Sequence, residues 1–143
     1  MTTVYRVTNP ATGEVAEEFA TATDSEILAA LDRSATTFTE WSRTPVAERA
    51  AILARVAEIY SERAEELAEV IKLEMGKAVP EGKGEVGLCS LIYKYFADNA
   101  EAFMADEPLR GPKDATAMIR RKPVGSLLGI MPWNFPYYQV ARF

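Results

Sequence analysis

The segment that most constrains the fold lies near residue 130, where the apolar run GSLLGIM (residues 125–131) is followed at once by PWNFP (residues 132–136). A short apolar run bounded by turn residues is typical of a strand buried on both faces, as in a parallel sheet. Pro132 cannot donate to a sheet ladder and would end this strand, whereas Pro136 suits the first turn of a helix. The pattern predicts a buried strand, a rigid corner and a new helix.

Helical patterns account for most of the chain before this corner. Apolar residues at helical spacing predict helices over residues 23–41, 44–76 with a restart near Ser61, and from Glu81 or Lys83 to Phe103. In the first of these helices the apolar face consists of Ile27, Leu28, Leu31, Ala35 and Phe38. Several helices followed by a buried strand, a turn and a new helix predict an α/β architecture with a parallel sheet.

Helix ends are marked by residues with strong local preferences. Thr23 and Glu26 have the spacing of a capping box. Thr44 suits the cap of the second helical region, and Pro45 suits its first helical position. Gly76 is expected to end that region, because glycine readily adopts the left-handed conformation found after helices.

Shorter segments predict strands and turns. Residues 4–7 and 15–19 are expected to form a hairpin around the turn sequence NPATG at residues 9–13. Residues 106–115 are typical of a polar loop, and residues 116–122 of a half-exposed strand.

The last residues also bear on domain organisation. The sequence YYQVARF keeps an amphipathic pattern and carries no helix stop signal. A hairpin and one core strand are too few to complete a parallel sheet. We therefore expect the 143 residues to be the N-terminal part of a longer polypeptide.

The composition limits the classes of partner. The formal net charge is −5, whereas nucleic acids and anionic membranes attract basic surfaces, so neither is an expected partner. No apolar stretch is long enough to span a bilayer, and the first residues lack the pattern of a signal peptide. The single cysteine, Cys89, cannot form an internal disulfide, which favours a cytoplasmic location.

The chain contains no histidine, and this excludes several kinds of complete active site within it. A Ser-His-Asp or Cys-His site cannot be built from these residues alone, and no metal site is expected from one cysteine without histidine. Cys89 falls on the apolar face of its predicted helix, where a small core residue is expected rather than a nucleophile.

The corner at residues 133–135 has the position of a ligand site. In open α/β folds ligands bind beyond the carboxyl ends of the strands, where the N-termini of the following helices favour negative charge. The side-chain amide of Asn134 could donate a hydrogen bond to a carbonyl oxygen that becomes an oxyanion. Asn134 could instead bond to nearby backbone as an ordinary turn residue, and the residues alone favour this structural role.

Residues 123–136, PVGSLLGIMPWNFP, strongly resemble the signature segment of the NAD(P)-dependent aldehyde dehydrogenases. The segments NPATGEV, RAAILARVAEIY, LEMGK and GEVGLCSLIYKYFADNAE occur in the order that this family shows, so the resemblance covers essentially the whole chain. It implies that residues 1–143 are the N-terminal part of a Rossmann-like NAD(P)-binding domain, with residues 115–124 in a protruding oligomerisation sheet. The catalytic domain would lie beyond residue 143.

The resemblance also implies roles for the corner residues. Asn134 matches the asparagine whose amide binds the substrate oxygen, which reverses the preference for a structural role. The residues that match the stretch lining the nicotinamide-ribose of the cofactor are Ile130, Met131, Pro132 and Trp133. The family's nucleophilic cysteine and general-base glutamate lie further along, so these 143 residues alone are expected to be inactive. In the implied reaction that cysteine forms a thiohemiacetal, hydride transfer leaves a thioester, and water releases the acid.

Arg142 bears on the class of aldehyde. Phe135, Gln139 and Arg142 are spaced to share a helix face, and the family lines its substrate tunnel with this helix. A guanidinium there would suit a carboxylate at the far end of the substrate, as in succinic semialdehyde. Tyr138 is a further candidate for the tunnel wall, and PWNFPYYQVARF resembles the succinate-semialdehyde dehydrogenases in particular. Alternatively, Arg142 could pair with an acidic neighbour or lie on a solvated face.

The expected cofactor is NADP or NAD, with NADP favoured because succinate-semialdehyde relatives with this N-terminal pattern lean towards it. The expected partners are a small aldehyde and further copies of the chain, in a homodimer or homotetramer. The alternatives are a dehydrogenase of a neutral or amino aldehyde and a non-catalytic helical module that docks a partner through its aromatic residues.

Overall fold

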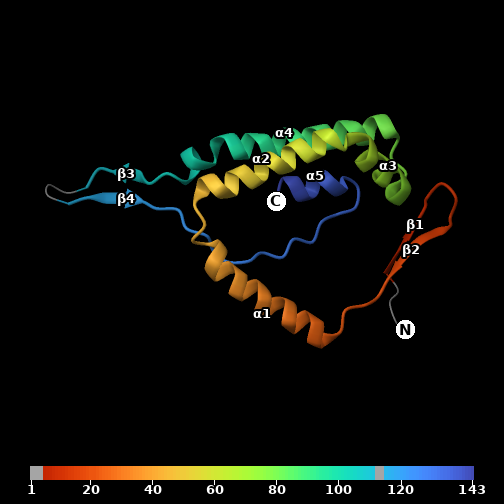
Figure 1. Ribbon diagram of the computed structural model, residues 1–143, viewed down its shortest axis with the longest axis horizontal. Coiled ribbons are helices and arrows are strands. Elements are labelled where there is room, and N and C mark those ends of the chain that lie inside the picture. Colours follow the sequence, from red (N-terminus) through yellow and green to blue (C-terminus); the bar gives the residue numbers. More distant parts are fainter. Residues whose placement is uncertain (1–4, 112–114) are drawn as a thin grey trace.

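Figure 1 shows the computed structural model, which describes residues 5–111 and 115–143. The strands and helices in chain order are β1 (Tyr5–Thr8), β2 (Val15–Phe19), α1 (Asp24–Trp41), α2 (Val46–Glu62), α3 (Ala64–Met75), α4 (Val79–Met104), β3 (Glu107–Leu109), β4 (Ala117–Ile119) and α5 (Pro136–Ala141). Helices α2, α3 and α5 pack against α4 in one cluster, while α1 and the β3–β4 hairpin extend away from it. The turn of the β1–β2 hairpin lies beside the end of α3, where Pro10 approaches Gly76.

Helix α4 is the element around which the cluster is built. At 26 residues it is the longest helix, and it contacts α2, α3 and α5. The fully buried side chains include Ile71 on α3 and Val86 and Cys89 on α4. No helix in the described part of the chain is long and apolar enough to cross a membrane.

Small residues bring α3 and α4 close together. A Cβ added at Gly82 of α4 would lie 3.2 Å from the Cβ of Ala68 on α3 and 3.3 Å from its Cα. Both residues are buried. A larger side chain at either position would therefore push the two helices apart.

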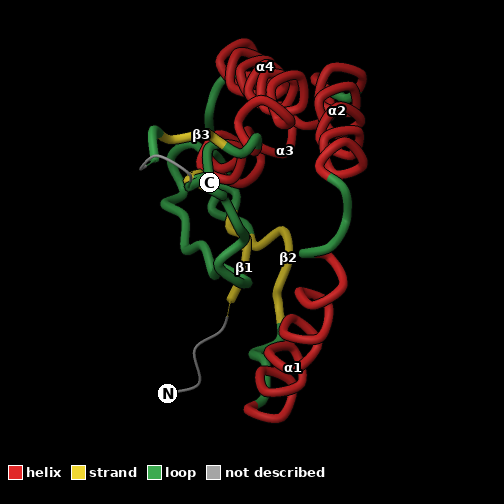
Figure 2. The backbone as a smooth tube through the Cα atoms, turned by 90° about the vertical axis from the view of Figure 1, so that its left-hand side faces the viewer, coloured by secondary structure: helices red, strands yellow, loops and turns green. Residues whose placement is uncertain are grey.

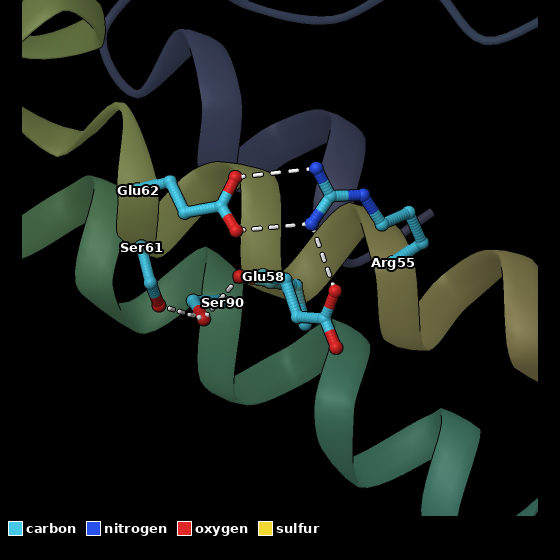
Figure 3. A network of polar contacts seen from close by, with 6 residues as sticks. Arg55, Glu58, Ser61, Glu62 and Ser90 are labelled. Atoms are coloured by element: carbon cyan, nitrogen blue, oxygen red, sulfur yellow. Dashed lines mark hydrogen bonds and ion pairs between the residues drawn. The ribbon is translucent and has the colours of Figure 1, made fainter.

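Polar contacts connect α2 to α4, as Figure 3 shows. The hydroxyl oxygens of Ser61 and Ser90 are 2.9 Å apart, and Ser90 also donates to the carbonyl oxygen of Ala57 at 2.8 Å. Nearby, Arg55 forms an ion pair with Glu62 within α2, on an exposed face. Exposed ion pairs contribute little to stability, so the serine contacts matter more for the position of the helices.

Three of the predicted helix ends agree with the structure. The capping box of α1 is confirmed, because Thr23 accepts from the backbone N–H of Glu26 while the Glu26 carboxylate accepts from that of Thr23. Gly76 ends α3 as predicted, in the left-handed conformation with a φ of 78°. The break predicted near Ser61 occurs at Arg63, which separates α2 from α3.

The predicted starts of α2 and α4 are wrong. Pro45 has an extended ψ of 145°, so it precedes the first helical residue instead of being that residue, and Thr44 provides no side-chain cap. Helix α4 begins at Val79, ahead of the predicted residues 81–83, because Pro80 fits the first turn of a helix.

The N-terminal hairpin is confirmed. Strands β1 and β2 pair in antiparallel orientation, and in the turn between them Asn9 accepts a side-chain hydrogen bond from the N–H of Ala11 at 2.9 Å. Residue Val4 of the predicted strand lies outside the described residues.

A second hairpin replaces part of the predicted loop. Strand β4 confirms the central residues of the strand predicted over 116–122, but the polar loop predicted over 106–115 is wrong at Glu107–Leu109, which forms β3. A lone strand leaves its backbone groups unpaired, and β3 satisfies those of β4. Ion pairs from Arg120 to Asp106 and from Arg121 to Glu107 connect the two flanks of this hairpin.

The buried strand predicted over residues 125–131 does not form among the described residues, and neither does the predicted parallel sheet. This segment has no regular secondary structure, and Leu128 and Ile130 are largely exposed. A strand buried on both faces needs strands beside it, whereas the described residues form only two separate antiparallel hairpins. The architecture of this part of the chain is helix-rich with small sheets.

Helix α1 stands apart from the helix cluster, as Figure 2 shows. The predicted helix is confirmed, but none of its residues is buried, and Ile27, Leu28 and Leu31 of its apolar face are exposed. One hydrogen bond reaches it from the segment before the corner, where the Ser126 hydroxyl donates to the carbonyl oxygen of Ser34 at 3.4 Å. The described residues therefore leave its apolar face uncovered.

The close approach of α3 and α4 can be tested with Gly82→Leu. This substitution should lower the free energy of unfolding by about 1–3 kcal/mol, because the added side chain has to displace α3. Gly87→Leu on the same helix is the matched control: nothing lies within 4 Å of a Cβ there, so stability should be unchanged or slightly higher. Urea unfolding followed by circular dichroism measures both, and equal effects would contradict the close packing.

Candidate active site

The predicted corner forms a turn at Trp133 and Asn134, directly before α5. Pro136 occupies the first turn of α5, as predicted. Asn134 is exposed, and its side-chain amide forms no hydrogen bond with any of the described residues. The turn is thus formed without help from this amide, which has no backbone partner among the described residues.

A buried ion pair lies next to the corner. Lys77, in the connection between α3 and α4, pairs with Glu85 of α4, and their side chains are only 10% and 1% exposed. The Lys77 ammonium also donates to the backbone carbonyl oxygen of Asn134 at 3.3 Å and lies 3.8 Å from the centre of the Phe135 ring. A cation over an aromatic face is favourable, especially away from water. Lys77 therefore contacts the corner at two successive residues.

The other oxygen of Glu85 caps α5. It accepts hydrogen bonds from the backbone N–H groups of Tyr137 at 3.0 Å and of Tyr138 at 3.1 Å. A helix leaves its first N–H groups without intrahelical partners, and Pro136 has no N–H to satisfy. A carboxylate at this end also interacts favourably with the partial positive charge of the helix N-terminus. Helix α5 is consequently attached to α4 through one carboxylate.

Neither Lys77 nor Glu85 is among the site residues predicted from the sequence. The signal for Glu85 is its place on the buried face of α4, beside Val86 and near Cys89, where an acidic residue requires a polar partner. The signal for Lys77 is its position directly after the helix stop at Gly76, which leaves its side chain close to the start of the next helix.

Two of the predicted substrate residues line a cavity beside α4. Phe135 and Tyr138 face this cavity of about 490 Å³, which Lys77 and Glu85 also line. The rings of Phe135 and Tyr138 contact each other edge to face, with their centres 6.2 Å apart. The structure thus brings together the ion pair, the corner and two aromatic side chains.

The other two predicted substrate residues are placed differently. Gln139 is buried, and its carboxamide oxygen has no hydrogen-bond partner among the described residues. Arg142 lines a second cavity, together with Phe103. Phe135, Gln139 and Arg142 are therefore not aligned along one cavity as predicted, because Phe135 and Arg142 line different cavities and Gln139 is buried.

Arg142 nevertheless lies close to the first cavity. Its guanidinium carbon is 5.5 Å from the centre of the Tyr138 ring. No carboxylate in the described part of the chain pairs with it, so the alternative of a salt bridge to an acidic neighbour is not formed there.

The residues predicted to line the cofactor form an exposed and mainly apolar surface. Ile130 is 87% and Trp133 is 74% exposed, Met131 is half-buried and Pro132 is exposed. An uncharged surface of this kind fits the nicotinamide end of a dinucleotide, and none of the four residues offers a cation to the phosphates. In the described ranges, no group of three or more His, Cys, Asp or Glu side chains is arranged to hold a metal ion.

The whole chain, including this corner, is similar to proteins of a known family. Residues 1–142 match the sequence profile of the aldehyde dehydrogenase family. The chain belongs to the aldehyde dehydrogenase family. The succinate-semialdehyde dehydrogenase [NADP(+)] of Deinococcus radiodurans is 42% identical over 139 residues, which cover 97% of this chain and 29% of that protein. One from Mycobacterium tuberculosis is 40% identical over 137 residues, or 94% of this chain and 30% of that protein.

Solved aldehyde dehydrogenase structures share the fold. The succinic semialdehyde dehydrogenase from Streptococcus pyogenes, determined in complex with NADP+, has a TM-score of 0.91 at 35% identity and covers 96% of this chain. An aldehyde dehydrogenase from Brucella melitensis biovar abortus has a TM-score of 0.90 at 30% identity and covers 98% of this chain. The chain spans 30% and 29% of the lengths of these two proteins.

Cys89 is a core residue, as predicted. Its side chain is fully buried in α4. Burial, together with the nearby charge of Glu85, raises the pKa of the thiol to about 11. The thiolate is the reactive form, so both the burial and the raised pKa oppose any reaction of Cys89 with an aldehyde.

Cys89 should accordingly resist alkylation. At neutral pH, iodoacetamide is expected to modify it at least about 100-fold more slowly in the folded protein than in urea, because folding removes both thiolate and access. Peptide mapping by mass spectrometry measures the rate, and Ala30→Cys on the exposed surface of α1 supplies a helical cysteine that should react freely. Equally fast labelling of the two sites would contradict the burial of Cys89.

Proposed function

We propose that the chain is the N-terminal part of an NADP-dependent aldehyde dehydrogenase that oxidises succinic semialdehyde to succinate. The observation that carries this proposal is the exposed amide of Asn134, which has no hydrogen bond among the described residues, on a corner whose backbone is held by a buried ion pair. The names of the relatives from Deinococcus radiodurans and Mycobacterium tuberculosis support both the substrate and the cofactor. The match to an enzyme family favours this function over a helical interaction module.

Asn134 would act as the donor to the oxyanion that forms when the nucleophile adds to the aldehyde carbonyl. A neutral amide N–H stabilises developing negative charge without transferring a proton. The amide stabilises the transition state fully only if it is in place before the charge develops, since a displaced donor loses most of its effect. Contacts of Lys77 and Glu85 with the backbone around Asn134 support this role.

The surface before Asn134 would hold the nicotinamide-ribose end of NADP+ through Ile130, Met131, Pro132 and Trp133. When bound, the cofactor accepts the hydride from the substrate. The apolar side chains at this surface are exposed, and exposed apolar surface is unfavourable in water. Their exposure therefore supports the proposal that a ligand or a further part of the protein covers this surface.

The remainder of the enzyme would lie beyond residue 143. It would include the catalytic domain with the nucleophilic cysteine and the general-base glutamate. It would also include strands that pair with residues 125–131 to form the parallel sheet of a Rossmann-like domain. The chain's coverage of only 29–30% of its relatives supports this division.

The substrate would enter along the cavity that Phe135 and Tyr138 line, whereas Gln139 is buried and does not line it. Arg142 beside Tyr138, without a carboxylate partner among the described residues, supports binding of the distal carboxylate of a semialdehyde. Residues 115–124 would take part in subunit pairing within a cytoplasmic homodimer or homotetramer. The projecting β3–β4 hairpin and its exposed Met118 and Ile119 support that role.

The role of Asn134 predicts that Asn134→Ala in the complete enzyme lowers kcat for succinic semialdehyde by about 10²–10³-fold, because one oxyanion donor is lost. The KM should change much less, since the interaction develops mainly in the transition state. Formation of NADPH followed by absorbance measures both constants.

Asn99→Ala is the matched control for this substitution. Asn99 is half-buried, and its amide donates to the carbonyl oxygen of Tyr95 within α4 at 2.8 Å, so its loss should leave kcat within about twofold of the unsubstituted enzyme. An unchanged kcat in Asn134→Ala would show that Asn134 is not the oxyanion donor.

The proposed substrate predicts a selective effect of Arg142→Leu. The KM for succinic semialdehyde should rise about 10- to 100-fold, which corresponds to the loss of a charge-assisted hydrogen bond. The KM for butanal, which has no distal carboxylate, should change little. Steady-state kinetics with the two aldehydes measure the difference, and equal effects on both would reject a role for Arg142 in recognising a carboxylate.

A further inference from the structure

We propose that Lys77 and Glu85 are positioning residues for the oxyanion donor: the ion pair sets the location of the Asn134 backbone and so determines the catalytic effect of its amide. This inference rests on the proposed function of Asn134 and adds two residues to it. Both residues also line the cavity proposed for the substrate, but the role inferred here acts through the backbone of the corner and needs no contact with the substrate.

Both carboxylate oxygens of Glu85 and the ammonium group of Lys77 contribute to contacts with the corner. One oxygen of Glu85 accepts from the N–H groups of Tyr137 and Tyr138, and the other is bound by Lys77. The ammonium of Lys77 donates in turn to the carbonyl oxygen of Asn134 at 3.3 Å. The backbone is thus held on both sides of Phe135 and Pro136.

The Asn134 side chain has no such support of its own. Its amide forms no hydrogen bond with the described residues. Its position is therefore set by the backbone that carries it, together with the preferences of its own side-chain torsions. If the contacts of Lys77 and Glu85 are lost, no other hydrogen bond from the described residues fixes the carbonyl group of Asn134.

A purely structural role is the alternative. A buried ion pair is weak support for stability, because the cost of removing both charges from water offsets their attraction. Apolar side chains of similar size could fill the same space. The hydrogen bonds that the ion pair makes to the backbone all go to residues 134–138, which favours a role in positioning the corner over general stabilisation of the fold.

The test compares Glu85→Gln in two backgrounds of the complete enzyme, with and without Asn134→Ala. With Asn134 present, the single-turnover rate of NADPH formation from succinic semialdehyde should fall about 10- to 100-fold, because a displacement of about 1 Å can cost 10²-fold. In the Asn134→Ala background the same substitution should cost less than about threefold, because there is no donor left to misplace. A structural role would not produce this difference.

Glu65→Gln is the matched control, because Glu65 of α3 also pairs with a lysine of α4, Lys83, but on the surface. It should leave the rate unchanged in both backgrounds. Lys77→Met provides the same comparison should Glu85→Gln fail to fold, and Lys77→Arg should restore most of the rate because it keeps the charge and a donor.

The outcomes separate this inference from the proposed function. If Asn134→Ala alone leaves the rate unchanged, the oxyanion role is wrong and the positioning role falls with it. If Asn134→Ala lowers the rate but the loss from Glu85→Gln is absent, or equal in both backgrounds, Asn134 keeps its role and the positioning role of the ion pair is rejected.

Discussion

The buried carboxylate of Glu85 is the constraint on which the position of the corner depends. A helix of six residues is not stable by itself in water, so α5 requires tertiary contacts in order to form. Glu85 satisfies two N–H groups at its start, and Lys77 neutralises the charge that this places in the interior. Removing one partner would leave the other buried without compensation. The corner and the ion pair therefore form one unit, although they lie far apart in the sequence.

This unit depends in turn on how α3 ends and how closely it approaches α4. Lys77 follows Gly76, whose left-handed conformation ends the helix and starts a short connection to α4. A residue with a side chain would adopt this conformation only at a cost. The contact of Ala68 with Gly82 keeps α3 close to the first turns of α4, and Lys77 in the short connection between the two helices is within reach of Glu85. The packing of two small residues thus contributes to the geometry of a polar site.

Features that depend on neighbouring residues could be predicted from the sequence, whereas features that depend on distant partners could not. The helices follow from apolar spacing, and the stop at Gly76 from the preference of one residue. The run at 125–131 has the composition of a buried strand, but a strand also requires partners, which the described residues do not provide. At the site, spacing was enough to place Asn134 in a turn before a helix. Spacing did not predict the roles of Lys77 and Glu85, because their hydrogen-bond partners in the corner lie 57 and 52 positions further along the chain.

The parts of the chain that remain uncovered are not the parts that hold the corner. Val124, Leu128 and the apolar face of α1 are exposed, so their burial would require contacts outside the described residues. Lys77 and Glu85, in contrast, are already buried by helices that the described residues contain. The backbone at Asn134 can therefore be set by the helix cluster, whatever later covers the apolar segment beside it. This independence would favour an oxyanion donor, because a hydrogen-bond donor lowers the activation barrier most when it is already in position before the ligand binds.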